Sequence, residues 1–206
     1  MQIMARPWLW YEPQNHKVYE WGGGPYGNND TSFLWTFTPI NNGSVSWTLS
    51  PAPAVNGLVL NRSIFTAASA ASDTTFYSLG GVTNLGETFV TPDVAVQGLV
   101  EHDFAANTWL NLSSKPATQS GFLVSGGASY TIGFGEAGFL IFLGGAIPST
   151  QIYDFDGTQQ ADMSLITLYD IHSGKWYHQT ATGTIPPPRQ FFCLVGSSSV
   201  EGSYEM

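Results

Sequence analysis

Short apolar runs alternate along the whole chain with clusters of glycine, asparagine, aspartate, serine and proline. Within any dozen residues, an apolar i, i+3, i+4, i+7 pattern is interrupted by glycine or proline, so the pattern does not predict helices. Short apolar runs bounded by turn residues are typical of β-strands. The pattern therefore predicts an all-β protein, and 206 residues is a length that one all-β domain commonly has.

The predicted strands repeat in a fixed order. Three apolar runs end in paired glycines, at Gly23 and Gly24, Gly80 and Gly81, and Gly144 and Gly145. Each run is preceded by another apolar run and is followed, after a loop, by a third run, a polar turn and a tryptophan. The tryptophans are Trp47, Trp109 and Trp176. The polar turns contain the glycine, asparagine and serine residues that close β-hairpins.

This repetition predicts units of four strands, a to d, each an up-and-down meander. Approximate bounds are 6–50, 62–113 and 127–180, and a fourth unit starts within 189–206 with its first strand at 190–195. We expect radially packed sheets in one incomplete domain, with the three tryptophans filling the wedges between sheets. The glycine pairs would permit close backbone contact. Arg6, Arg62 and Arg189, each just before a strand a, suggest a structural hydrogen-bonding role.

Residues 144–189 resemble a kelch repeat, because paired glycines are followed by Tyr169, Trp176 and a Pro-Pro-Pro-Arg segment ending at Arg189. In the earlier units the tyrosine position holds Trp35 or Phe37, and His102 or Phe104. Residues 8–13, 98–104 and 168–189 are similar to fungal cell-surface kelch proteins. That resemblance implies a kelch-type β-propeller, of which this chain would be a truncated fragment. Three blades and the start of a fourth form an open arc, for which the expected partners are the remaining blades of the full-length protein or another copy of the chain.

Composition narrows the functional classes. Six lysine and arginine residues against fifteen aspartate and glutamate residues give a net charge of −9, which argues against nucleic-acid binding. The longest apolar run, 138–143, is too short to span a membrane as a helix, and the N-terminus shows no signal peptide. Glycosylation sequons start at Asn29, Asn42, Asn61 and Asn111 and favour an extracellular or cell-surface location, with a cytoplasmic one as the alternative.

Candidate reactive groups are few. Residues 133–138 match GxGxxG, but a strand rather than a helix follows, so we interpret them as a turn. Galactose oxidase also carries kelch repeats, which makes a copper-dependent carbohydrate oxidoreductase the alternative function. Its candidate ligands would be His16, His102, His172, His178 and Cys193, but two of these histidines fall in turns and Cys193 in an apolar strand. An acidic segment with Asp154, Asp156 and Asp162 is interpreted as a solvated turn rather than a calcium loop. We therefore predict no enzyme activity, no cofactor and no metal site.

The expected ligand-binding face lies at one end of the blades. In an up-and-down blade the b-to-c and d-to-a loops emerge together, and here the longest loops are 25–32, 50–61, 82–97 and 146–162. Loops on a rigid scaffold commonly carry recognition. The candidate contacts are Tyr26, Tyr153, Asp154 and Asp156. The sequence thus predicts a non-catalytic cell-surface or cell-wall module that binds a protein or a glycan.

Overall fold

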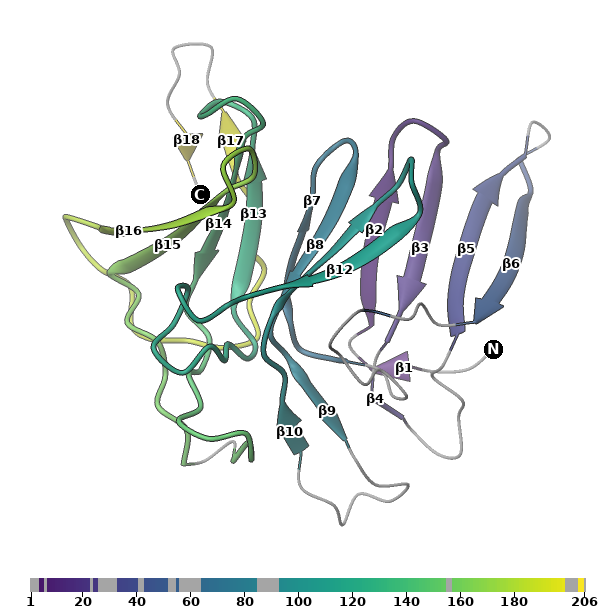
Figure 1. Ribbon diagram of the computed structural model, residues 1–206. Coiled ribbons are helices and arrows are strands. Elements are labelled where there is room, and N and C mark those ends of the chain that lie inside the picture. The colour runs from purple at the N-terminus through teal and green to yellow at the C-terminus, as the bar shows by residue number, and fades with distance from the viewer. Residues whose placement is uncertain are drawn as a thin grey trace.

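The computed structural model describes residues 4–5, 7–22, 24–25, 33–40, 43–51, 55, 64–84, 93–154, 157–198 and 204–205. These residues contain strands and turns but no helix, and form three four-stranded antiparallel sheets, here called blades 1, 2 and 3. In Figure 1 the blades follow one another from right to left as an open arc. The predicted all-β, partial propeller fold is confirmed.

Each blade is a meander whose strands pair in chain order. Blade 1 contains β2 (Trp8–Glu12), β3 (Lys17–Trp21), β5 (Phe33–Pro39) and β6 (Val45–Pro51). Blade 2 contains β7 (Ala68–Ala71), β8 (Thr75–Leu79), β11 (Leu99–Asp103) and β12 (Thr108–Leu112). Blade 3 contains β13 (Gly127–Thr131), β14 (Phe139–Leu143), β15 (Leu165–Asp170) and β16 (Lys175–Thr180).

Three short strand pairs accompany the blades. They are β1 (Met4–Ala5) with β4 (Gly24–Pro25), β9 (Val82–Asn84) with β10 (Asp93–Ala95), and β17 (Ser197–Ser198) with β18 (Tyr204–Glu205). Gly24 therefore pairs with Ala5, whereas Gly23 lies outside the described residues.

Strand registers make the three blades equivalent residue by residue. One row of paired residues crosses each blade and ends at its tryptophan; we call it the tryptophan row. It comprises Tyr11, Val18, Phe37 and Trp47 in blade 1, Ala71, Phe76, His102 and Trp109 in blade 2, and Tyr130, Leu140, Tyr169 and Trp176 in blade 3. The kelch tyrosine position is therefore taken by Phe37 in blade 1 and by His102 in blade 2.

The hydrophobic core consists of layers between neighbouring blades. Trp8, Trp10 and Trp21 of blade 1 pack against residues of blade 2 that include Phe76 and Trp109. The ring centroids of Trp10 and Phe76 lie 4.2 Å apart in a stacked arrangement. A second layer joins blades 2 and 3 in the same way. Burial of such large aromatic side chains, at ~25 cal/mol per Å² of apolar surface, stabilises these layers.

The tryptophans that were expected to fill the wedges do so in two of the three blades. Trp109 is buried in the layer with blade 1, and Trp176 is half-buried against the layer with blade 2. Each tryptophan therefore faces the preceding blade. The expectation is wrong for Trp47, which is 55% exposed, because no described strand lies over the equivalent face of blade 1.

In blades 2 and 3, backbone hydrogen bonds at the second glycine of the pair join consecutive units. Gly81 N–H donates to the Leu123 carbonyl (2.8 Å), and Gly145 N–H donates to the Arg189 carbonyl (2.9 Å). Arg189 thus holds this junction through its backbone, while its guanidinium Nε donates to the Pro187 carbonyl on the surface (3.3 Å). Arg6 and Arg62 lie outside the described residues.

One non-glycine residue per unit adopts a left-handed conformation at this junction. Thr66, Ser125 and Phe191 have φ values of 58°, 56° and 55°. They are linked in series, since Ser125 N–H donates to the Thr66 carbonyl (2.6 Å) and Phe191 N–H donates to the Ser125 carbonyl (3.0 Å). Because a left-handed residue interrupts an extended run, strand a of blade 2 begins at Ala68, two residues after Thr66.

The predicted first strand of the fourth unit, 190–195, does not form. Phe192 and Leu194 instead lie against the glycine backbone of blade 3, beside Gly127 and Gly144. A strand is held by ladder bonds to a neighbour, and the two-residue strands β17 and β18 provide few. Cys193, expected to be a small core residue inside this strand, is exposed.

Candidate ligand-binding site

A cleft of about 700 Å³ opens between blades 2 and 3. Its walls are the loop that connects β12 to β13 and the loop that connects β14 to β15. These are a d-to-a and a b-to-c loop, so the cleft lies on the face where the sequence places ligand binding. Volumes of several hundred Å³ are typical of sites for small molecules.

The floor of the cleft is apolar. It is formed by side chains that belong to the layer between blades 2 and 3, namely Leu79, Leu123, Phe142 and Ile147. Because these side chains are fixed by the packing of two sheets, the floor is rigid. A ligand with an apolar patch could pack on it without reorganising the core.

Hydrogen bonds from its side chains to backbone groups hold the β12–β13 loop in place. The Ser114 hydroxyl is buried, accepts from Gly98 N–H (2.8 Å) and donates to the Gly121 carbonyl (2.6 Å). The Thr118 hydroxyl donates to the Phe122 carbonyl (3.0 Å). The loop is therefore a preformed wall, which reduces the entropy lost on binding.

His178 ties the β12–β13 loop to blade 3. Its Nε2 lies 2.8 Å from the Pro116 carbonyl, and its Nδ1 lies 3.3 Å from the Thr167 hydroxyl. Since a carbonyl can only accept, Nε2 carries a proton, and in the neutral ring Nδ1 accepts from Thr167. Both nitrogens are engaged, so His178 positions the wall of the cleft.

The rim carries polar side chains that remain available for a ligand. In the part of the chain that the structure describes, Lys115, Gln119, Gln159 and Gln160 line the cleft without a side-chain hydrogen bond. Asp162 accepts from Ser164 N–H (2.8 Å), and these hydrogen bonds from Ser164 lower the pKa of its carboxyl. Three amides, one ammonium group and one carboxylate thus surround an apolar floor.

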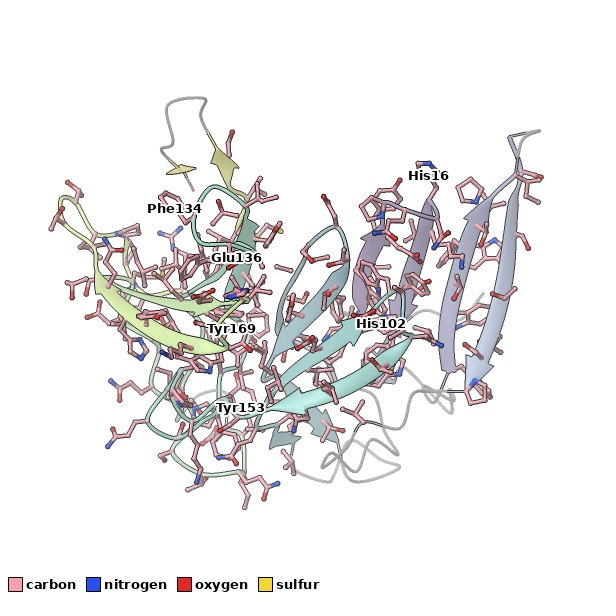
Figure 2. The ribbon with its side chains drawn as sticks, turned by 45° about the horizontal axis from the view of Figure 1, so that its top comes forward. His16, His102, Phe134, Glu136, Tyr153 and Tyr169 are labelled. Atoms are coloured by element: carbon pink, nitrogen blue, oxygen red, sulfur yellow. The ribbon has the colours of Figure 1, made fainter. Side chains whose placement is uncertain are left out.

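The residues proposed from sequence as contacts lie elsewhere on the same face or outside the described residues. Figure 2 shows Tyr153 at the loop end of the sheets and His16 at the opposite end. Tyr153 packs against the cluster of Val82, Ala95 and Val124, and its hydroxyl donates to Gln190 Oε1 (3.2 Å). Tyr153 therefore braces the loop, and neither it nor exposed Asp154 lines the cleft. Tyr26 and Asp156 lie outside the described residues.

The sequence reading missed the cleft residues because it selected only the longest loops. The loop between β12 and β13 carries Lys115, Gln119, serines and threonines, and that polar composition was the available signal. Gln159 and Gln160 stand in the predicted 146–162 loop, next to the aspartates that drew attention.

One of the four sequons can be placed. The side chain of Asn111 packs against Gly98, and its Nδ2 donates to the Gln97 carbonyl (3.4 Å). Because a glycan would be attached to this nitrogen, the folded chain disfavours modification there. Asn29, Asn42 and Asn61 lie outside the described residues.

The candidate copper ligands are dispersed. His16 and His172 lie in turns as predicted, His102 is buried between blades 1 and 2, and Cys193 is exposed on the C-terminal segment. Among the described residues no three histidine, cysteine, aspartate or glutamate side chains are grouped to hold a metal ion. Residues 133–138 form the turn between β13 and β14, as their sequence context predicts. The described residues contain no helix that is long and apolar enough to cross a membrane.

Two comparisons with known proteins agree on the architecture. The chain is 30% identical over 137 residues to a kelch repeat-containing protein of Arthroderma benhamiae, a match that covers 61% of this chain and 20% of that protein. The solved structure of YjhT, a kelch-type propeller, matches 96% of this chain and 63% of its own length with a TM-score of 0.56 and 17% identity. No family model matches the chain. The chain spans about a fifth of the curated relative and 63% of the solved chain. Repeat pattern, sheet topology and both similarities give this chain the fold of a partial kelch-type β-propeller.

Proposed function

We propose that this protein is a non-catalytic binding module of the cell surface or cell wall, which holds its ligand in the cleft between blades 2 and 3. The cleft itself is the observation that carries the proposal. It joins a rigid apolar floor to a rim of side chains that have no side-chain hydrogen bond among the described residues.

The distribution of perturbed side chains supports binding over catalysis. Catalytic groups commonly combine a shifted pKa with a place in the ligand cleft. Here burial lowers the pKa of His102 and raises that of Tyr169 and Glu101, and these side chains belong to strands at the blade interfaces. In the cleft the pKa of Asp162 is lowered by the turn to which it belongs. The shifts are thus explained by packing and turn formation.

The rim favours a neutral ligand rich in hydroxyl groups, such as a glycan. An amide both donates and accepts, as a hydroxyl does, and three of the rim groups are amides. The net charge of −9 disfavours an anionic ligand. A glycan ring also offers an apolar C–H face for the floor formed by Leu123 and Phe142.

The test is a binding screen against immobilised neutral oligosaccharides, with short peptides as the comparison set. We expect at least one oligosaccharide to bind, and a Gln119→Ala, Gln160→Ala double variant to weaken binding by about tenfold or more. Gln14→Ala is the matched control, since Gln14 is an exposed glutamine in the turn between β2 and β3, at the opposite end of the blades. Binding that the double variant leaves unchanged would disprove this site, and binding of peptides alone would disprove the ligand class.

A further inference from the structure

The two walls of the cleft each carry one charged side chain. Lys115 stands on the β12–β13 loop and Asp162 on the β14–β15 loop, and both line the cleft. Among the described residues, the single side-chain ion pair joins His172 to Glu136, in the turns at the opposite end of blade 3. Neither charge in the cleft is therefore neutralised by a neighbouring side chain, and both are left for a ligand.

The wall that carries Asp162 is held in place by hydrogen bonds. Ala161 N–H donates to the Gly145 carbonyl (2.8 Å), and Leu165 N–H donates to the Asp162 carbonyl (3.1 Å), so the backbone is fixed on both sides of this residue. The carboxylate itself accepts from Ser164 N–H (2.8 Å), which lowers the pKa of the carboxyl and keeps it ionised at neutral pH. Since a carboxylate has two oxygens that each accept more than one hydrogen bond, capacity for a further donor remains. Asp162 thus places a negative charge at one defined position on the rim.

Lys115 determines the charge preference of the cleft less strongly. Its ammonium group ends a flexible stem, so its charge is not held at one position. An ammonium group also donates to neutral hydroxyl oxygens, and Lys115 can therefore contact an uncharged part of the ligand. The net charge of −9 adds a negative field that attracts a cation and repels an anion. The cleft is thus better matched to a positive substituent than to a negative one.

We propose, building on the function proposed above, that the cleft prefers a glycan that carries a primary ammonium group, as an amino sugar does, and that this group binds to Asp162. The hydroxyl groups of the ligand then meet the rim amides of Gln119, Gln159 and Gln160, and a sugar ring packs on the apolar floor. Charge recognition at one position is thereby added to contacts that suit a neutral sugar. An amino sugar should bind more tightly than the same sugar with a hydroxyl or an acetamide group at that carbon.

Isothermal titration calorimetry with three oligosaccharides of equal length and equal linkage tests this preference. They are oligomers of glucosamine, of N-acetylglucosamine and of glucose, which differ only in the ammonium, acetamide or hydroxyl group on the second carbon. At about pH 6, where primary amines are protonated, we expect the glucosamine oligomer to bind about three- to fivefold more tightly than either neutral oligomer. Added salt should reduce this advantage, because it screens an exposed ion pair.

Two substitutions that each remove one carboxylate show whether the preference arises at Asp162. Asp162→Asn removes the charge but keeps an oxygen that can accept from Ser164 N–H, so the turn is retained, and this variant should lose the preference. Asp73→Asn is the matched control, because Asp73 is an exposed aspartate in the turn between β7 and β8, at the opposite end of the blades. It should keep the preference. Circular dichroism of both variants checks that the fold is kept.

The outcomes separate this inference from the function on which it rests. A neutral oligomer that binds as tightly as the glucosamine oligomer overturns the inference and leaves glycan binding in the cleft intact. A preference that Asp162→Asn retains also overturns it, and so does one that Asp73→Asn reduces equally, since the overall negative charge would then be its source. Failure of the glucosamine oligomer to bind, while a neutral oligosaccharide of the screen does bind, overturns the inference alone. If no oligosaccharide binds, the proposed function fails with it.

Discussion

The imidazole of His102 lies flat on the indole of Trp109, with ring centroids 4.1 Å apart and planes 9° apart. The two residues pair across β11 and β12, and both face Trp10 of blade 1. His102 is 1% exposed, and its Nε2 lies 3.2 Å from Asn107 Oδ1. In this position it replaces the tyrosine of the kelch repeat, so a titratable group stands in the layer between blades 1 and 2.

The stability of this layer should depend on pH. Burial lowers the pKa of His102 in the folded chain, an effect that the nearby Asn107, Glu12 and Asp103 reduce but do not cancel. The unfolded chain takes up a proton near pH 6.5, so below that pH it binds more protons than the folded chain and the free energy of unfolding decreases. We expect urea unfolding to show a larger loss of stability from pH 7 to pH 5 in the wild type than in His102→Phe.

Two partly buried carboxyl groups also affect how stability changes with pH, so the wild type has to be compared directly with His102→Phe. Burial raises the pKa of Glu20 and Glu101 in the folded chain. Because the folded chain then binds more protons at these groups than the unfolded chain, they increase the free energy of unfolding as the pH falls. Both remain in His102→Phe, so subtracting the two unfolding curves isolates the histidine. Phenylalanine occupies the same repeat position in blade 1, at Phe37, and is therefore a compatible replacement. Equal losses in the two proteins would show that His102 does not control the pH dependence.

Trp109 and Trp47 should differ sharply in their contribution to stability, although they are equivalent in the repeat. Trp109→Ala removes a buried indole and should cost about 3–5 kcal/mol of unfolding free energy. Trp47→Ala removes an indole that is 55% exposed and should cost less than about 1 kcal/mol. Urea unfolding gives both values when it is measured at a protein concentration so low that association between chains does not contribute. Similar costs for the two substitutions would mean that Trp47 is covered within a single chain.

The same contrast shows how far sequence reasoning extends. Glycine pairs, hairpin turns and tryptophans predicted the four-strand blades and their order, because these signals are local and repeat in each unit. They did not distinguish Trp47 from Trp109, since exposure depends on whether another blade lies over the face. The first strand of the fourth unit failed for a related reason: the apolar run containing Phe192 is strand-like, but its ladder partners are missing from the described residues.

For the candidate binding site, the sequence predicted the face of the blades on which it lies but not the residues that line the cleft. Topology alone places the b-to-c and d-to-a loops at one end of the blades, and this part of the prediction needs no side-chain detail. Which loop residues meet in the cleft depends on interactions such as the His178–Pro116 hydrogen bond, between residues far apart in the sequence. Tyr153 was selected as a candidate contact on this face, and the structure adds that it packs against a cluster that involves β9 and β10.

Gly80 should be among the least replaceable glycines. Its φ is +68°, and a methyl group added there would overlap the Leu123 carbonyl oxygen of the next unit. Gly43 has a similar φ of +79° in a turn where nothing lies within 4 Å of the added carbon. Gly43→Ala should therefore cost only the left-handed strain, about 1–2 kcal/mol, and Gly80→Ala clearly more. Thermal unfolding of both variants measures the difference, and a Gly80→Ala protein as stable as Gly43→Ala would contradict the close contact between units.

Glycosylation tests the proposed cell-surface location together with the packing of Asn111. When the chain is secreted from a eukaryotic host, we expect the folded product to carry no glycan at Asn111, because its Nδ2 donates to the Gln97 carbonyl and its Oδ1 is buried. Replacing Asn29, Asn42 and Asn61 by glutamine destroys the other three sequons. The mass of this variant should then be the same before and after treatment with an enzyme that cleaves N-glycans. Ser113→Ala, which destroys only the Asn111 sequon, is the control and should lose as much mass in this treatment as the wild type. A folded, secreted product with a glycan on Asn111 would show that the contact with Gly98 and Gln97 is dispensable, and a product without any glycan would remove the support that the sequons give to a cell-surface location.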